Sequence, residues 1–474
     1  MLRVFRCRVF LVVVLTLIFK VMFDILKRFC WFMCLAGLIL SITSCEEYLD
    51  TKPDKKLATP ATAKDLQAIL DNIPRINEAE TGLSEIASDN FFLPDANWSA
   101  LIEVENRDAY LWKRSPVAEL YWSYMYRKIY DVNLVLEHID KVTYQSEGQK
   151  NSIYANALLV RGMAFQKLAE VFCVPYRRGV AAEDRLGVVL KRSADINEDL
   201  KRSTLEETHN QIKEDLTEAI KYLPDNPYDY PTRAAKGAGY AAMARYLLSI
   251  GDYTSAGYYA DSSLALKSTL SDYNTVAQIP YPFEFYNVEI IYYSRSYAYR
   301  NLSEANARVD PLLYQSYEDD DLRKQLFFKV QADGYYSFIG DYSKANFEKF
   351  TGLTTAEMLL IRAECNARAG KLQEAEDDVI TLLRKRYVSN FDFTGLDLQR
   401  DPDVLLRRIM LERRKELVGR GVRWSDIRRM SFEEDIRLER LLYDTSYVLD
   451  QGAIQDFAFL IPEAVIERGG YQQN

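Results

Sequence analysis

Six aromatic residues are the side chains that the sequence makes most suitable for contacting a ligand. They occur in stretches without helical periodicity and comprise Trp98, Tyr281, Phe283, Tyr286, Tyr335 and Tyr336. An aromatic ring presents an apolar face, and Tyr and Trp also present a hydrogen-bonding edge, which together suit the CH face and hydroxyl groups of a sugar. For any single ring, packing of its loop onto neighbouring helices is the alternative. Two or more of the six rings in one solvent-facing groove would favour a binding role.

Side chains for metal or covalent chemistry are sparse. The chain has two His, His138 and His209, which we expect on polar helix faces and without zinc-ligand spacing to a second His or Cys. The sequence also lacks the glycine-rich phosphate loop, the dinucleotide fingerprint and the nucleophile elbow. We therefore expect no enzyme, no metal and no cofactor. A glycosidase with paired carboxylates remains an alternative, because acidic residues are abundant.

An acidic run from Glu318 to Asp321 contains oxygen ligands of the kind that calcium prefers. Its spacing differs from the alternating ligands of an EF-hand loop. We expect instead a solvated turn that caps a helix beginning near Leu322, where negative charge interacts favourably with the helix dipole.

The first 44 residues predict an export signal. Two apolar runs, residues 9–19 and 29–40, are each shorter than the roughly 20 residues that span a bilayer, and the second follows a basic pair. The second run ends in LSITS and Cys45, which resembles a bacterial lipobox, so Cys45 would carry a lipid that anchors the mature chain to a membrane. A buried Cys at the end of a core helix is the alternative. Met22 has a complete leader behind it and is a candidate translation start.

The mature chain is acidic and contains few cysteines. The leader carries six basic residues and one acidic residue, so its removal changes the formal net charge from -9 to -14. This charge argues against a nucleic-acid partner, because phosphate binding requires basic patches. Apart from Cys45 and three Cys of the leader, only Cys173 and Cys365 remain, both in helical patterns. We expect buried thiols and no disulfide framework.

The elements that must position these side chains are mainly helices. From about residue 59 onward, apolar residues recur every three or four positions, which is the period of amphipathic helices. Helices are predicted over residues 117–142 and 152–171. A third is predicted to begin at a capping box formed by Ser203 and Glu206.

Two pairs of helices share a weak internal repeat. Ala, Gly and Ala recur at the same spacing, as Ala244, Gly251 and Ala256 and again as Ala363, Gly370 and Ala375. This resembles tetratricopeptide-like hairpins, in which Gly permits the turn and Ala permits close helix contact; unrelated hairpins with similar turns are the alternative. Between the pairs, residues 271–350 predict loops and short strands, where binding residues tend to lie. The expected fold is mostly α, with tetratricopeptide-like helical hairpins and a loop-rich insertion.

Several segments along most of the chain resemble the SusD/RagB family. YLDTKP resembles the mature start of the family, RSTLEETHNQIKEDLTEAIKYLP the helix before its first hairpin, and LTTAEMLLIRAECNARAGKLQEAEDDVITLLRKRY its later hairpin. The most specific match is IMLERRKELVGRGVRWSDIRRM. There Glu412 and Glu416 alternate with Arg413 and Arg423, and we expect a partly buried ion-pair network that locks the C-terminal lobe. FLIPEAVIERGGYQQN resembles the tail of the family, whose IPEAVI stretch corresponds to a strand-like docking segment.

The resemblance implies a signal peptide over residues 1–44 and a SusD-like domain over 45–474, with helical parts at 59–270 and 351–474 around the loop-rich segment 271–350. It also implies a lipid-anchored protein of the outer membrane, facing the cell exterior. Such a protein binds an oligosaccharide or other nutrient and delivers it to a TonB-dependent SusC-like transporter.

A periplasmic tetratricopeptide-like scaffold that binds protein segments is the alternative function. An aromatic groove away from the repeats would favour nutrient uptake, whereas a polar concave face of the repeats would favour the scaffold. Two carboxylates about 5 to 10 Å apart in a deep cleft would favour a glycosidase.

Overall fold

Helices dominate the chain from residue 61 onward. A computed structural model describes Met22 and residues 60–182, 184–226, 228–297, 300–344, 348–395 and 401–474. Apart from Met22, the expected signal peptide and Cys45 lie outside these residues. Residues 61–474 form one unit. Within the described ranges, no helix has both the length and the apolar character that crossing a membrane requires.

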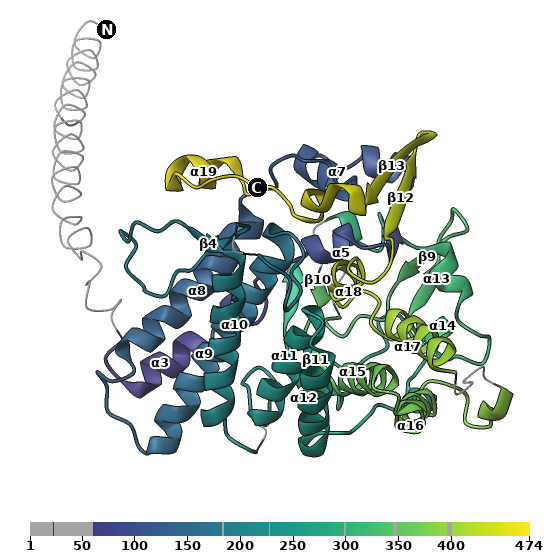
Figure 1. Cartoon of the computed structure of the whole chain (residues 1–474), viewed down its shortest axis with the longest axis horizontal. Helices are drawn as coiled ribbons and strands as arrows, with labels where there is room; N and C mark the ends of the chain where they lie inside the picture. Colours follow the sequence, from purple (N-terminus) through teal and green to yellow (C-terminus); the bar gives the residue numbers. More distant parts are fainter. Residues whose placement is uncertain are drawn as a thin grey trace, which may run out of the picture. The chain divides into compact units, whose positions relative to one another are not determined.

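The long helices of this unit either bury one apolar side, as at residues 63–70 and 205–222, or are buried on most sides, as at residues 147–172 and 236–249. The helices are listed here in chain order. They are α3 (Ala63–Leu70), α4 (Ile73–Ile76), α5 (Leu83–Ala87), α6 (Asp95–Ser99), α7 (Val104–Tyr110), α8 (Leu120–His138), α9 (Glu147–Phe172), α10 (Leu205–Tyr222), α11 (Lys236–Ser249), α12 (Tyr253–Leu266), α13 (Pro311–Gln315), α14 (Arg323–Leu326), α15 (Thr355–Arg368), α16 (Leu372–Leu383), α17 (Pro402–Glu416), α18 (Arg423–Met430) and α19 (Glu463–Gly469). Successive helices from α8 to α12 pack against each other, and the row continues from α12 to α15 and α16 (Figure 1). The helices predicted over residues 117–142 and 152–171 are confirmed as α8 and α9.

The two predicted helical hairpins are confirmed as α11–α12 and α15–α16. Gly251 and Gly370 lie in their turns at φ values of 73° and 74°, where a side chain would be strained. The repeated small residues Ala244, Ala256, Ala363 and Ala375 are all fully buried. Because α12 also packs on α15, the two hairpins are neighbours in space as well as similar in sequence.

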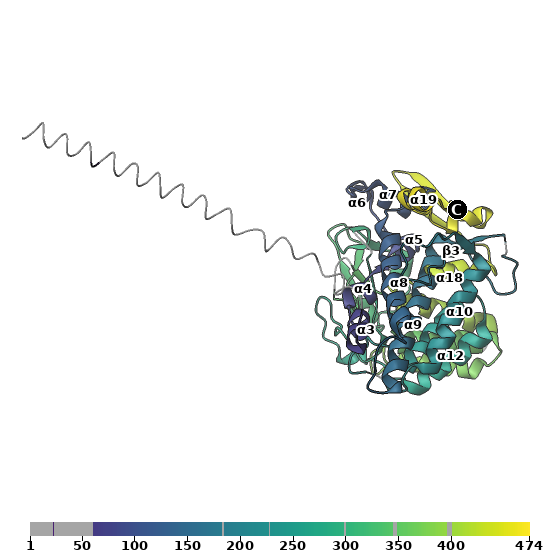
Figure 2. The same ribbon diagram turned by 90° about the vertical axis from the view of Figure 1, so that its left-hand side faces the viewer.

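Short strands occur in the insertion, as its loop-rich sequence predicts, and also before the first hairpin and after the second. The strands are β1 (Glu80–Thr81), β2 (Phe91–Phe92), β3 (Leu186–Val189), β4 (Arg202–Thr204), β5 (Ile290–Tyr292), β6 (Arg295–Tyr297), β7 (Arg308–Val309), β8 (Phe328–Val330), β9 (Tyr336–Phe338), β10 (Glu348–Phe350), β11 (Leu353–Thr354), β12 (Arg437–Leu442) and β13 (Thr445–Asp450). Strand β6 pairs in parallel with β1 and antiparallel with β10, with Ser296 opposite Glu80 and Lys349. In Figure 2 the green insertion lies on one side of α8 and α9, and α10 and α12 lie on the other.

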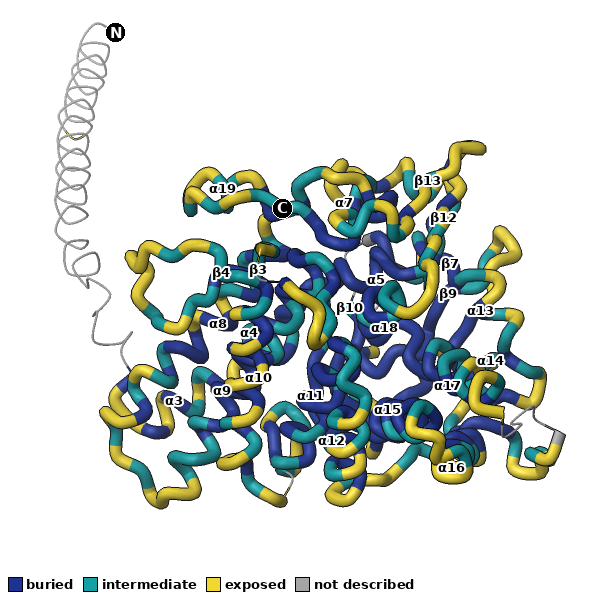
Figure 3. The backbone as a smooth tube through the Cα atoms, viewed as in Figure 1, coloured by how far each residue is buried: buried dark blue, intermediate teal, exposed yellow. Residues whose placement is uncertain are grey.

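The buried core lies where the insertion and the helices meet. Figure 3 shows buried backbone concentrated in α11, α15 and α18, whereas the outer turns are exposed. Both remaining thiols, Cys173 and Cys365, are buried and unpaired, as the sequence predicts. Burial raises the pKa of Cys365 to about 12.

Three local predictions are wrong in detail. The capping box of α10 is formed by Thr204 and Glu207, one residue later than expected, because Ser203 instead donates to the Val188 carbonyl. His209 is only 9 % exposed and stacks on Tyr176, so it does not lie on a polar face.

The tail is the third correction. Residues 463–469 form α19 and are not strand-like, and the only extended contact is an isolated bridge between Leu460 and Pro116 among the described residues. The proline at position 462 directly precedes the helix and pre-sets its start.

A buried ionic cluster joins the insertion to the C-terminal helices. Arg323 has no exposed side-chain surface and binds Asp321 at 2.8 Å, Glu412 at 2.6 Å and Glu416 at 3.1 Å. Arg386, equally buried, binds Glu416 at 2.8 Å. The predicted network is therefore confirmed, and it draws cations both from α17 itself, where Lys415 pairs with Glu412 at 3.3 Å, and from outside that helix, as with Arg323 and Arg386.

The sequence also assigns the wrong partners to two arginines and the wrong environment to an acid. Arg413 binds Asp426 at 2.9 Å, and Arg423 binds Asp89 at 2.7 Å, so neither pairs with Glu412 or Glu416. Asp321, expected in a solvated turn, is fully buried because Arg323 and Lys415 neutralise it.

Replacing Arg323 by Met should lower the free energy of unfolding by about 3 to 5 kcal/mol, because it removes a cation shared by three buried carboxylates and leaves them with an excess of negative charge. The exposed pair of Lys329 and Glu304 supplies the control, since Lys329→Met should cost less than about 1 kcal/mol. Urea unfolding measures both values. Similar small losses in the two variants would contradict a stabilising role for the cluster.

The cluster should also make stability depend on acid pH. Burial alone would raise the pKa of Glu412, but Arg323 and Lys415 outweigh burial and hold the pKa at about 2. The contribution is therefore present above the usual value of 4.5 and is lost as pH falls toward about 2. In Glu412→Gln, urea midpoints should fall less steeply than in the unmodified protein between these pH values. Parallel pH profiles would argue against this assignment.

Candidate functional site

Tyr286 is the residue of the predicted aromatic set that lines a described pocket. Its ring packs at 4.6 Å from Phe285 and 5.2 Å from Tyr293, measured between ring centroids, and these neighbours fix its position. Tyr230 meets the same ring edge-on at 6.0 Å and is 64 % exposed. Tyr286 is brought here by the loop before β5, and Tyr230 by the loop between α10 and α11.

The pocket beside Tyr286 has a volume of about 150 Å³. Tyr228 and Tyr286 supply aromatic walls, while Leu266, Ile290 and Ile291 supply apolar surface. Its polar lining consists of Asp225, Asp229, Arg233, Lys267 and Asn287. Few polar groups on a largely apolar and aromatic wall are typical of small-molecule sites.

Internal contacts hold several of these side chains in place. The Tyr228 hydroxyl shares a hydrogen bond with Ser152, and the guanidinium of Arg233 lies 5.7 Å from the centre of the Tyr228 ring. Lys267 Nζ donates to the Ile290 carbonyl at 2.6 Å, and burial lowers the pKa of this amine.

Asn287 is fixed on one side only. Its Oδ1 accepts the backbone N–H of Glu289 at 3.0 Å, whereas its buried Nδ2 has no hydrogen-bond partner among the described residues. A buried amide without a partner carries a desolvation penalty that a bound acceptor would relieve. The pocket thus combines ring faces with hydrogen-bond donors and acceptors, which is the chemistry that a polyhydroxylated ligand requires.

A second pair of tyrosines lies at α8. Burial and the carboxylate of Glu78 raise the pKa of Tyr286, and the guanidinium of Arg295, which binds Glu78 at 2.7 Å, partly offsets them. Two residues beyond Arg295, the ring of Tyr297 lies 5.6 Å from that of Tyr124 on α8. We call Tyr124, Tyr230, Tyr286 and Tyr297 the tyrosine band.

The other five predicted rings lie elsewhere. Phe283 is 2 % exposed and packs among core rings, and the Trp98 indole donates to the Arg107 carbonyl. The Tyr281 hydroxyl donates to Glu304 at 2.6 Å. Tyr336 stacks on Tyr314, and Tyr335, which is 45 % exposed, contacts Phe92 edge-on. None of these five lines the pocket beside Tyr286.

The sequence misses Tyr124, Tyr228, Tyr230 and Tyr297. Tyr124 lies in a helix, where a tyrosine is expected to pack, and Tyr297 lies in the aromatic start of the insertion. The run NPYDYP at residues 226–231 could have revealed Tyr228 and Tyr230. Its Pro, Asn and Asp residues predict a turn, and the two tyrosines lie within that turn.

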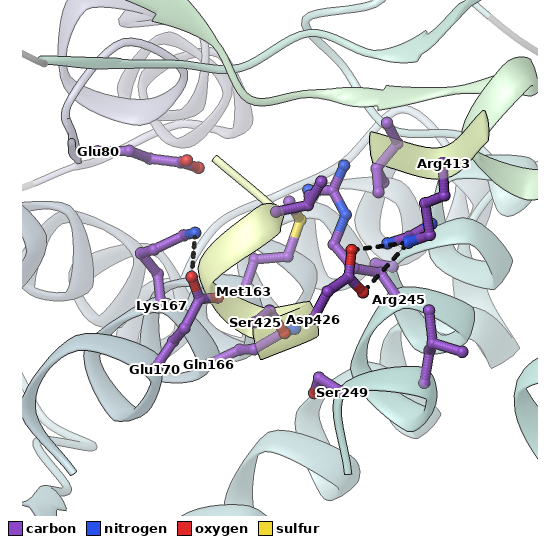
Figure 4. A pocket seen from close by; sticks show the side chains of 14 residues that line it. Glu80, Met163, Gln166, Lys167, Glu170, Arg245, Ser249, Arg413, Ser425 and Asp426 are labelled. Carbon is purple, nitrogen blue, oxygen red and sulfur yellow. Dashed lines mark hydrogen bonds and ion pairs between the residues drawn. The ribbon is translucent and has the colours of Figure 1, made fainter. Parts of the chain in front are cut away.

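A second, water-sized pocket of about 30 Å³ lies in the interior between α9, α11 and α18. Figure 4 shows two of its carboxylates bound by cations; Glu170 lies 3.1 Å from Lys167, and Asp426 lies 2.9 Å from Arg413. Burial raises the pKa of Asp426, but Arg413 and its neighbours lower it further, so the net shift is downward. Neither the space nor the ionised acid suits the paired carboxylates of a glycosidase, which need a protonated member.

A wider polar groove of about 770 Å³ runs over the two helical hairpins. Its charged residues pair internally, as when Arg362 binds Asp378 at 2.7 Å and Asp261 at 2.5 Å. Tyr258, 68 % exposed, lies in the same groove. This polar face is the feature expected of a protein-binding scaffold.

Metal ligands are not grouped in the described part of the chain. Across its ranges, no three His, Cys, Asp or Glu side chains come together as they would around an ion. The acidic run near Leu322 instead binds cations of the protein, such as Lys415, whose Nζ lies 2.7 Å from Glu318.

Several solved structures have the same fold as this chain. A SusD superfamily protein from Bacteroides thetaiotaomicron is 19% identical, with a TM-score of 0.68 over 87% of this chain and 100% of that one. A SusD-like carbohydrate-binding protein from Bacteroides vulgatus is 18% identical, with a TM-score of 0.63 over 86% and 97%. A laminarin-binding SusD-like protein is 18% identical, with a TM-score of 0.61 over 88% and 99%. No curated protein matches the sequence.

Two family models match the sequence. The SusD-like model described as "Starch-binding associating with outer membrane" matches residues 47–248, and the model of the SusD family matches residues 336–451. The matched ranges include the helix before the first hairpin and the C-terminal segment with Glu412 and Glu416. The chain belongs to the SusD/RagB family.

Proposed function

We propose that this protein binds a glycan at the pocket beside Tyr286 and along the tyrosine band. The observation that carries the proposal is the combination of two aromatic walls with five polar side chains around about 150 Å³. The family model described as starch-binding supports a sugar ligand. Two structures of the same fold, named as carbohydrate-binding and laminarin-binding, give the same support.

The pocket and the tyrosine band would contact different parts of the same ligand. A pocket of about 150 Å³ corresponds to roughly five waters of liquid, at about 30 Å³ each, so a ligand entering it displaces several waters. Tyr124 and Tyr297 lie outside this pocket and would contact further parts of the same chain of sugars. The ligand is therefore proposed to be an oligosaccharide held at one end.

We also propose that the protein is a lipid-anchored component of nutrient uptake, without enzymatic activity. Cys45 would carry the lipid, and the protein would face the cell exterior and deliver its ligand to a TonB-dependent SusC-like transporter. The lipobox-like residues before Cys45 support the anchor. The family description, which includes association with the outer membrane, supports the location.

Replacing Tyr286 by Ala should weaken glycan binding about tenfold, which corresponds to about 1.4 kcal/mol, because it removes a wall of the pocket. A glycan array that includes laminarin and starch-derived oligosaccharides identifies the ligand, and calorimetry then measures the dissociation constant. Tyr335→Ala removes a more exposed ring that lies outside the pocket and should leave binding unchanged. Equal affinities of the Tyr286 variant and the unmodified protein would exclude this pocket as the site.

Replacing Cys45 by Ala should move the protein from the membrane fraction to the soluble fraction, because the chain would lose its proposed lipid. The unmodified protein, purified in detergent from native outer membranes, should carry with it a TonB-dependent barrel that mass spectrometry identifies. Retention of the Cys45→Ala protein in membranes would contradict the anchor. Purification without any barrel would contradict the transport partner.

The polar groove over the hairpins supports a second candidate function, protein binding by the repeats. Tyr258 is the exposed ring in this groove and is remote in sequence from the tyrosine band. The same purification distinguishes the two functions. A scaffold would retain a protein partner but bind no member of the glycan array, and Tyr258→Ala would reduce the retained partner.

A further inference from the structure

A small pocket next to the interior pocket of Figure 4 contains a positive charge that has no carboxylate partner within the described ranges. It has a volume of about 30 Å³ and lies where α9, α10, α11 and α18 meet. Its polar lining includes Gln166, Glu170, His209, Ser425 and Arg428. Gln166, Glu170 and Ser425 also line the pocket of Figure 4, so the two spaces are neighbours.

Arg428 is a buried cation without a carboxylate partner. It is 7 % exposed, and its guanidinium donates to the backbone carbonyls of Phe457 and Ala169. Among the described residues, no Asp or Glu oxygen pairs with it, whereas Arg423 and Arg429 on the same helix bind Asp89 and Glu364. A guanidinium has five N–H donors, so two carbonyl contacts leave donors available.

The remaining charges near the pocket do not compensate for Arg428. Glu170 is the acid that faces it, but Glu170 Oε1 lies 3.1 Å from Lys167 Nζ, so this pair is neutral as a whole. His209 adds no charge, because burial and the nearby Arg428 lower its pKa to about 3. When Lys167 is counted with Glu170 and Arg428, these three side chains carry one net positive charge. A buried charge without a partner is strongly destabilising.

Hydrogen-bond donors surround the same space. The imidazole of His209 is 9 % exposed, and its Nδ1 has no partner in the described part of the chain. Ser425 contributes a hydroxyl and Gln166 an amide NH₂, and both can donate to an acceptor. A positive charge with several donors and little space favours a small, fully dehydrated acceptor.

We propose that this pocket binds one monatomic monovalent anion, with chloride as the physiological ligand, against the guanidinium of Arg428. About 30 Å³ suffices for one or two waters, which is also the size of a halide and excludes polyatomic anions with bulky groups. The anion neutralises the unpaired charge and ties α18 to α9 and α10. This site is independent of the proposed glycan pocket.

Bromide provides the direct test, because its anomalous scattering distinguishes it from water. Crystals soaked in sodium bromide should show an anomalous peak within hydrogen-bond distance of Arg428. Bromine peaks confined to the protein surface, or a water in this pocket, would overturn the proposal.

Thermal unfolding provides a second test in solution. The unmodified protein should melt about 2 °C higher in sodium chloride than in sodium gluconate at equal ionic strength, as expected for an anion about tenfold above its dissociation constant. His209→Phe keeps a ring against Tyr176 but removes the N–H, and should lose most of this shift. His138→Phe, the same change at the other histidine, should retain it.

Ser425→Ala removes one donor with little change in volume and keeps the test valid if the His209 variant fails to fold. A smaller chloride shift in this variant supports the site. The anion site is contradicted if chloride does not raise the melting temperature of the unmodified protein, or if it raises the melting temperature of all variants equally.

Discussion

The buried cluster of Arg323 and Arg386 is the interaction on which the rest of the structure depends. Its acids come from α17 and from the insertion, and Arg386 follows α16. Arg386 also binds Glu289 at 2.7 Å. Glu289 lies three residues after Tyr286, and its backbone N–H is the group that Asn287 accepts. The position of the candidate pocket is thus set by an ion pair in the core and not by packing of the loop alone.

This arrangement explains how an irregular segment can hold a defined site. Residues 271–350 contain few long elements, and isolated two-residue strands contribute little stability. The buried Glu289 of that segment is neutralised by Arg386, and Arg323 of the segment binds acids of α17. Because these buried charges must meet their partners, the pairs select one position for the loop. The helical repeats therefore serve as the rigid support on which the aromatic insertion is mounted.

The sequence predicts the helical framework well because its signals are local. The spacing of Ala244, Gly251 and Ala256, and of its later counterpart, specifies a turn and a close contact that require no knowledge of the rest of the chain. Ion pairs between distant residues cannot be predicted from such local signals. Nothing near Glu412 in the sequence identifies Arg323 as its partner, because the two residues are 89 positions apart.

The candidate site was predictable only in part for the same reason. Tyr286 and Phe283 are three residues apart in one loop, yet Phe283 lies in the core and Tyr286 lines a pocket. Their exposure depends on which side of the loop faces the helices, and that is decided by distant contacts. Tyr228 and Tyr230 come from another loop, and the sequence alone does not show that this loop lies beside Tyr286.

The burial of the two cysteines has a consequence for how the chain can mature. At a pKa of about 12, only about one in 10⁵ Cys365 side chains is a thiolate at neutral pH, and the thiolate is the form that attacks disulfides or reacts with oxidants. Cys173 is equally enclosed, with 1 % exposure. Cys173 and Cys365 are therefore protected from forming mixed disulfides in oxidising surroundings, and the part of the chain that the structure describes is stabilised by buried ion pairs and not by a bridge between these two thiols.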